Sequence, residues 1–123
     1  PVPWCSMQVR KAYGVAAAAH YGPDAHVLLW PSAESGTLPV EAGVAVMYRR
    51  ELDAAPPGER RRLQRRLVEE LMQQQSPWPA VQSLGASDLV DPRQTRERLC
   101  EWADLARLRL PALVGQATFP YRC

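Results

Sequence analysis

Apolar positions along this chain recur with two different periods, which predict short strands first and helices later. Apolar residues at every second position predict a strand over residues 4–10. A compact apolar run over residues 26–30, which Pro31 ends, predicts a second strand. The alanines of residues 15–20 favour a helix between the two strands, because alanine has the highest helix propensity.

The middle of the chain changes to helical spacing. Apolar residues three and four apart predict a helix over residues 40–54, which Pro56 and the residues after it end. A second helix is predicted over residues 59–75, with polar residues covering the sides away from one apolar face. That face consists of Leu63, Leu67, Val68, Leu71 and Met72. A helical turn at residues 79–84 and a minimal strand at residues 88–90 follow.

Asp91 and Pro92 mark the start of the last predicted helix. The Asp91 side chain can cap free N–H groups, and proline suits the first helical position. We expect Pro111 to end this helix and residues 111–123 to form an irregular tail. Cys100 is expected to be a small buried hydrophobe. The stripe predicted to be buried consists of Leu99, Trp102, Ala103, Ala106 and Leu110. Early strands and later helices together predict the α/β or the α+β class.

Composition places the chain among single globular domains. It has 123 residues, of which 46% are hydrophobic and 23% charged. The net charge of +2 gives no electrostatic reason to expect nucleic acid as a partner. No apolar stretch reaches the ~18 residues of a membrane span. The arginines near residues 60–66 are predicted to form a solvated face, because glutamates at 69 and 70 offset them.

Side chains that could carry chemistry are few. His20 and His26 have no partners at metal-ligand spacing, so no metal is expected. The 3 cysteines form neither a CxxC pair nor a disulfide framework, which favours reduced thiols in a cytoplasmic protein. One junction is more informative. Where the first strand ends and a helix begins, at residues 10–16, backbone N–H groups are left unpaired and can stabilise a developing oxyanion.

A series of motifs in a fixed order begins at this junction. It consists of Arg10-Lys11-Ala12-Tyr13-Gly14, Trp30-Pro31-Ser32-Ala33-Glu34, Glu41-Ala42-Gly43-Val44 with Tyr48-Arg49-Arg50-Glu51-Leu52, and Asp91-Pro92-Arg93-Gln94-Thr95-Arg96. The series resembles the C-terminal domain of carboxyltransferase (β) subunits of biotin-dependent acyl-CoA carboxylases, such as the propionyl-CoA carboxylase β subunit. The resemblance covers residues 2–110. With no initiator methionine at residue 1, the chain is expected to be part of a longer protein.

The resemblance implies a fold and an activity. The expected fold is part of a crotonase-like β-β-α superhelix, helix-rich toward its C-terminus, in which residues 1–123 form one partial, biotin-side domain. The implied activity transfers the carboxyl group of carboxybiotin, carried on another protein, to the α-carbon of an acyl-CoA. The implied partners are an N-terminal carboxyltransferase domain, a biotin carboxylase or biotin carrier subunit, the acyl-CoA and further copies in a homo-oligomer. The chain is not expected to be active alone.

Matched residue by residue, the resemblance also implies a site. The backbone N–H groups of Val15 and Ala16 form the oxyanion hole for biotin, and Tyr13 and Gly14 complete the biotin-binding turn. The chain departs from the family pattern here: Val15 replaces a glycine, and Ala17 with the residue after it replaces Tyr-Asp. Two alternatives stay open, and these departures motivate the first of them. The chain could be a non-catalytic paralogue or assembly module, or the α subunit of a biotin-dependent acyl-CoA decarboxylase.

Overall fold

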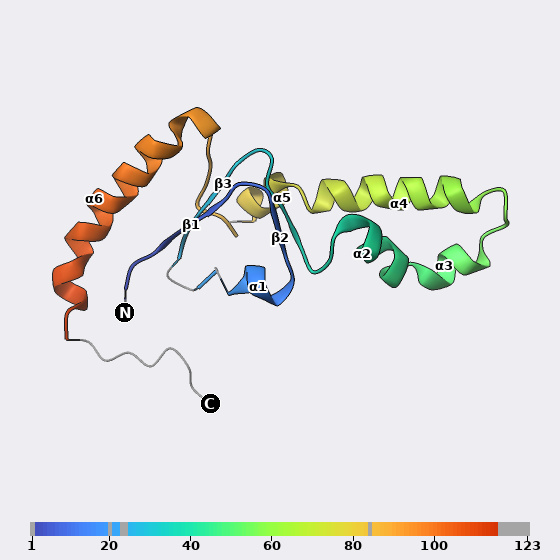
Figure 1. Cartoon of the computed structure of the whole chain (residues 1–123), viewed down its shortest axis with the longest axis horizontal. Helices are drawn as coiled ribbons and strands as arrows, with labels where there is room; N and C mark the ends of the chain where they lie inside the picture. The colour runs from blue at the N-terminus through green and yellow to red at the C-terminus, as the bar shows by residue number, and fades with distance from the viewer. Residues whose placement is uncertain (1, 20, 23–24, 84, 116–123) are drawn as a thin grey trace.

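The computed structural model describes residues 2–19, 21–22, 25–83 and 85–115. Within them, the strands form two small parallel sheets (Figure 1). One sheet has the order β1-β3-β5 and the other the order β2-β4. The strands are β1 (Cys5–Gln8), β2 (Lys11–Tyr13), β3 (His26–Leu29), β4 (Glu34–Gly36) and β5 (Asp88–Leu89). The class is α/β, one of the two that the sequence predicts.

The central strand β3 forms the core of the larger sheet. Val27, Leu28 and Leu29 are almost fully buried, as expected of a parallel strand with neighbours on both sides. β3 confirms the strand predicted over residues 26–30. The strand predicted over residues 4–10 is observed as the shorter β1, and a second strand, β2, follows before the chain turns into a helix.

The smaller sheet was not predicted. β2 pairs with β4 in parallel, with Lys11 opposite Glu34 and Tyr13 opposite Gly36. Neither strand shows clear alternation in its sequence, and both owe their conformation to pairing across a long stretch of chain. The helix α1 (Gly14–Ala18) follows β2 directly and starts one residue earlier than expected.

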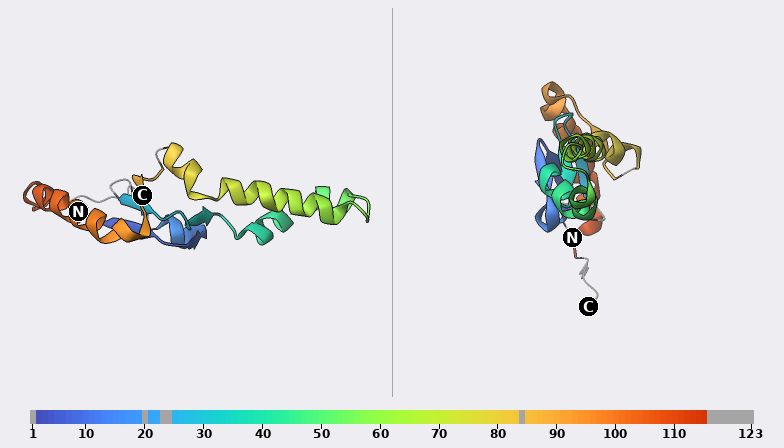
Figure 2. Two further views of the ribbon diagram at one scale, coloured as in Figure 1. Left: turned by 90° about the horizontal axis from the view of Figure 1, so that it is seen from above. Right: turned by 90° about the vertical axis from the view of Figure 1, so that its right-hand side faces the viewer.

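A helical arm projects from the sheets (Figures 1 and 2). It contains α2 (Val40–Met47), α3 (Arg49–Ala54) and α4 (Arg60–Gln74). α4 confirms the helix predicted over residues 59–75. The single helix predicted over residues 40–54 is wrong, because Tyr48, with φ −108° and ψ 20°, leaves the helical conformation and separates α2 from α3.

The arm has its own apolar core. Its buried members are Val40, Val44, Leu52, Leu67 and Leu71. α2 approaches α4 closely, since a Cβ at Gly43 would lie 3.0 Å from a methyl group of Leu71. Met72 was predicted to lie on the buried face of α4 but is 57% exposed. The arginines on α4 are exposed, as the solvated-face interpretation predicts.

The last helix, α6 (Thr95–Leu113), leaves the sheets at the end opposite the arm (Figures 1 and 2). It follows α5 (Pro77–Gln82), β5 and the 3₁₀ turn η1 (Pro92–Gln94). Contrary to prediction, Pro111 lies inside the helix. Residues 111–113 of the predicted tail are therefore helical, and residues 116–123 lie outside the described part.

The predicted burial of α6 is confirmed only in part, because the predicted stripe is half-buried at Leu99, Trp102, Ala103 and Ala106. None of its residues is buried, Leu110 is 44% exposed, and Cys100 is exposed as well. Apolar spacing marks a face that can be buried but does not supply the surface that buries it completely. In the described ranges, no helix is long and apolar enough to cross a membrane.

Candidate functional site

The turn at residues 13–16 changes the chain from strand to helix within one residue. Tyr13 is extended, with φ −125° and ψ 150°, and Gly14 follows with φ +70°. A side chain at residue 14 would meet only the Thr37 carbonyl oxygen, at 3.7 Å. Glycine is therefore required at this position by the left-handed backbone conformation and not by lack of space.

The N-terminus of α1 is not capped by a side chain. The first N–H groups of a helix have no acceptor within the helix, so those of Val15 and Ala16 are available to an external acceptor. Val15 lies within the helix, where a β-branched residue adopts the backbone conformation without a positive φ. Its side chain is 89% exposed. The backbone therefore does not require the glycine that the family pattern has at this position.

Tyr13 is anchored by a carboxylate from the neighbouring strand. Its hydroxyl donates a hydrogen bond of 2.8 Å to Oε2 of Glu34. Burial, the bond to Glu34 and the negative charges of Glu34 and Glu41 together raise the pKa of Tyr13 to about 12. The hydroxyl thus keeps its proton at neutral pH. This bond joins the motif at residues 10–14 to the motif at residues 30–34.

Two further residues support Glu34, Gln8 at the end of β1 and Tyr21 between α1 and β3. Gln8, only 8% exposed at the end of β1, donates from Nε2 to the Glu34 carbonyl oxygen at 2.9 Å. Its Oε1 accepts a hydrogen bond from the hydroxyl of Tyr21. Burial raises the pKa of Tyr21, which keeps that hydroxyl protonated. The two sheets are therefore joined at Glu34, whose backbone carbonyl accepts from Gln8 of β1 and whose carboxylate accepts from Tyr13 of β2.

The helical arm holds β4 from its other end. Gln75, at the end of α4, is 7% exposed and donates from Nε2 to the Leu38 carbonyl oxygen at 2.9 Å. Its own carbonyl oxygen accepts a hydrogen bond of 3.0 Å from the N–H of Ser35. The side chain lies so close to Gly36 that a Cβ there would be 2.7 Å from Nε2.

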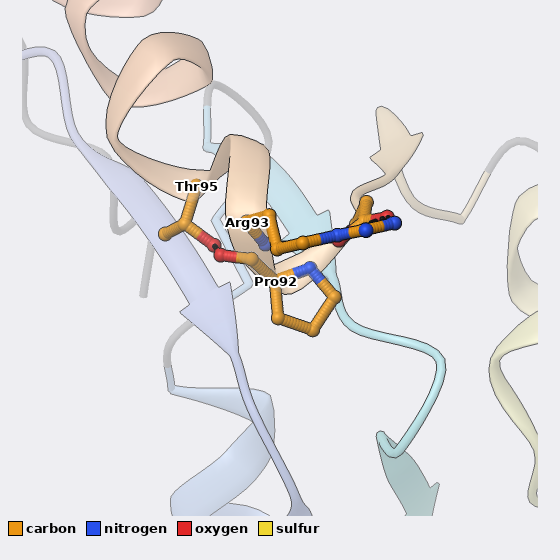
Figure 3. Close-up of polar contacts among 4 residues, drawn as sticks. Pro92, Arg93 and Thr95 are labelled. Carbon is orange, nitrogen blue, oxygen red and sulfur yellow. Dashed lines mark hydrogen bonds and ion pairs between the residues drawn. The ribbon is translucent and has the colours of Figure 1, made fainter.

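The motif at residues 91–96 also connects to the motif at residues 30–34. Trp30 Nε1 donates to the hydroxyl of Thr95 at 2.9 Å. That hydroxyl in turn donates to the Pro92 carbonyl oxygen at 2.8 Å, as Figure 3 shows. Asp91 accepts from the backbone N–H of Arg93, which confirms the predicted cap. Side-chain and backbone hydrogen bonds from Arg93 lower the pKa of Asp91 to about 2.

Sequence reasoning identified the turn at residues 13–16 but missed the residues that support it. Glu34 was part of a motif without a role, while Gln8, Tyr21 and Gln75 were not singled out. For Gln8 the sequence did contain a signal, because it is a polar residue within a predicted strand and a buried polar side chain needs hydrogen-bond partners. His26 lies half-buried on β3, and His20 is outside the described residues. Within the described ranges, no His, Cys, Asp or Glu residues gather in a group that could hold a metal.

Known proteins are similar to this chain in sequence and in fold. Residues 1–110 match the family described as Carboxyl transferase domain. The chain is 35% identical over 113 residues to the carboxyltransferase subunit of propionyl-CoA carboxylase from Haloferax mediterranei, covering 88% of this chain and 21% of that protein. It is 32% identical over 103 residues to the methylmalonyl-CoA carboxyltransferase 12S subunit from Propionibacterium freudenreichii, covering 80% of this chain and 19% of that protein.

A solved structure gives the same result. The transcarboxylase 12S hexamer core, with methylmalonyl-CoA and methylmalonic acid bound, superimposes with a TM-score of 0.74 at 27% identity. The match covers 98% of this chain and 22% of that one. The chain thus spans about a fifth of the length of the relatives it matches. Its fold is crotonase-like, and the chain belongs to the carboxyl transferase domain family.

Proposed function

We propose that this chain supplies the biotin side of a carboxyltransferase, which moves a carboxyl group from carboxybiotin on a carrier protein to the α-carbon of an acyl-CoA. The observation that carries the proposal is the uncapped start of α1 after Gly14, in a chain of this family. The proposal extends to the complete assembly: an acyl-CoA-holding N-terminal domain, a biotin carboxylase or biotin carrier subunit, and further copies of the chain.

Biotin fits the donors of this turn. The carbonyl oxygen of biotin accepts hydrogen bonds and gains negative charge when the carboxyl group leaves. In the proposed arrangement, the N–H groups of Val15 and Ala16 donate to that oxygen, while Tyr13 and Gly14 set the direction of the two donors. Each donor is already oriented before the reaction, so little reorganisation is needed as the charge develops.

A cytoplasmic location is part of the proposal. Cys5 and Cys100 are both free, as thiols in a reducing compartment are.

The assembled protein is tested by decarboxylation of malonyl-CoA or methylmalonyl-CoA in the presence of free biotin. We expect turnover that depends on biotin. A fully assembled oligomer with no turnover would contradict the proposed function.

A proline at residue 15 tests the donor role directly. Val15→Pro removes one N–H group at a helix start, where proline is tolerated. Loss of one oxyanion donor is expected to lower kcat by about 10²–10³-fold. Val15→Ala is the matched control, because it removes the branched side chain and keeps the N–H group. Equal activity of the two variants would show that the Val15 N–H is not a donor in the reaction.

The departure at Val15 favours one alternative function, a non-catalytic assembly module. If the wild-type assembly is inactive and Val15→Gly restores no biotin-dependent turnover, the alternative is preferred. Turnover by the wild-type assembly excludes it.

A further inference from the structure

Glu34 is hydrogen-bonded through its backbone and its side chain to three different residues. Its N–H donates to the Arg10 carbonyl oxygen at 2.9 Å, and its carbonyl oxygen accepts from Gln8 Nε2 at 2.9 Å. Its carboxylate accepts from the Tyr13 hydroxyl at 2.8 Å. The backbone bonds fix where β4 lies against the end of β1. The carboxylate alone reaches forward to the turn.

The bond to Tyr13 acts close to the start of α1. Tyr13 is the last residue of β2 and directly precedes Gly14, whose φ of +70° sets the direction of the helix. α1 is short, has no side-chain cap and packs mainly on β2. The position of its first N–H groups therefore depends on how firmly Tyr13 is held.

The backbone that carries this carboxylate is held in place by residues on both sides. Gln8 uses both ends of its amide, with Nε2 on the Glu34 carbonyl and Oε1 on the hydroxyl of Tyr21. Because Gln8 is buried, its amide cannot exchange these partners for water. On the other side, Gln75 fixes the backbone of β4 through the N–H of Ser35. The strand carrying Glu34 is thus fixed at both ends.

We propose that Glu34 is a positioning residue for the turn at residues 13–16: its carboxylate holds the Tyr13 hydroxyl, and Tyr13 in turn fixes the direction of the Val15 and Ala16 N–H groups. The ladder between β2 and β4 pairs the strands without this bond, so the side-chain bond adds orientation more than strand pairing. The inference rests on the proposed function, because it assigns Glu34 to the biotin side of that site.

The test uses the complete, assembled protein and compares Glu34→Ala, Glu34→Gln and Tyr13→Phe with wild type. Glu34→Gln keeps an oxygen acceptor for the hydroxyl, whereas the other two variants abolish the bond. The matched control is Glu41→Gln, which removes the other carboxylate charge that acts on Tyr13 but no hydrogen bond to it. Steady-state rates are measured while free biotin and acyl-CoA are varied separately.

We expect Glu34→Ala and Tyr13→Phe each to lower kcat/KM for biotin by about 10-fold to 100-fold, since displacements of about 1 Å have effects of that size. The KM for acyl-CoA should stay within about 2-fold of wild type, because a positioning effect is confined to the biotin side. Glu34→Gln should largely restore the biotin kinetics. The double variant Glu34→Ala with Tyr13→Phe should lose no more than either single variant, because both remove the same bond.

A second readout does not depend on turnover. Ultraviolet titration of the phenols, with Tyr13→Phe identifying the contribution of Tyr13, should place its pKa at about 12 in wild type. The pKa of Tyr13 should fall in Glu34→Ala, because both the hydrogen bond and the charge are lost. An unchanged pKa would overturn the inference.

The kinetic outcomes separate the two proposals. Wild-type turnover with unaffected biotin kinetics in Glu34→Ala and Tyr13→Phe would overturn the role of Glu34 and leave the proposed function standing. The same holds if both substrates are affected equally alongside a lower thermal midpoint, which indicates a structural tie only. A wild-type assembly without turnover would overturn both. If Glu34→Ala fails to fold, Tyr13→Phe still decides the question, because it removes a single hydroxyl.

Discussion

Replacing Gly36 by alanine is expected to destabilise the junction between the arm and the smaller sheet. A Cβ at this position would lie 2.7 Å from Nε2, 2.9 Å from Cδ and 3.2 Å from Cγ of Gln75. Gln75 cannot simply move aside, since it is 7% exposed and bonded through Nε2 to the Leu38 carbonyl oxygen at 2.9 Å. The clash must therefore be relieved by displacing either this side chain or β4.

The magnitude follows from three contributions to the free energy of unfolding. Overpacking in a filled site costs about 1–3 kcal/mol. Loss of the bond to the Leu38 carbonyl adds about 1 kcal/mol. The lower entropy of alanine in the unfolded chain returns about 0.5–1 kcal/mol, since the φ of Gly36 is accessible to alanine. The net expected loss for Gly36→Ala is about 1–3 kcal/mol.

Urea unfolding followed by circular dichroism measures this loss. Gly58→Ala is the matched control, because no atom lies within 4 Å of a Cβ there. It should be neutral or stabilising by about 0.4–1 kcal/mol. Adding Gln75→Ala to Gly36→Ala should recover part of the loss, with a favourable coupling of about 1 kcal/mol. The reasoning is refuted if Gly36→Ala is as stable as wild type, or if the two substitutions are simply additive.

Three other predictions follow from the same structure. Leu71→Ala should lower the free energy of unfolding by about 2–5 kcal/mol in urea titrations, because Leu71 is only 7% exposed and its loss leaves a cavity in the arm core. Met72→Ala, at an exposed position of the same helix, should change it by less than about 0.5 kcal/mol. Gly14→Ala should cost about 1–2 kcal/mol through its positive φ, and Gly14→Asn less, as thermal unfolding would reveal; equal losses would argue against backbone strain. Asp91 should titrate at a pKa of about 2 by NMR. Its contribution to stability is therefore fully present above the ordinary carboxyl pKa of 3.8 and is lost as the pH falls toward 2. Arg93→Ala should raise the pKa of Asp91, and an unchanged pKa would contradict the assigned hydrogen bonds.

Elements whose signals are local could be predicted from the amino-acid sequence alone. Helical spacing predicted α4 to within one residue at each end, and a compact apolar run predicted β3. Asp91 caps the turn after it, as its position before Pro92 indicates. These features depend on residues only a few positions apart, so their physical causes can be read along the chain. The motif order likewise indicated the family that the comparisons establish.

The candidate site was only partly accessible in this way. The junction at residues 10–16 was visible as the end of a strand and the start of a helix, and the resemblance named Tyr13, Gly14, Val15 and Ala16. The positive φ of Gly14 and the bond between Tyr13 and Glu34 were not visible. The biotin-binding role of these residues stays a prediction.

Contacts between residues far apart in the chain became visible only in the folded structure. β2 and β4 have weak local sequence signals. They form because they pair with each other over a long sequence separation, with Lys11 opposite Glu34 and Tyr13 opposite Gly36. Apolar spacing also could not show that α4 and α6 differ in how deeply their apolar faces are buried. The face of α4 packs against α2 and includes fully buried residues, whereas the similar stripe of α6 is at most half-buried. The reason is physical: periodicity shows which face can be buried, while parallel pairing and packing depend on partners that local sequence does not specify.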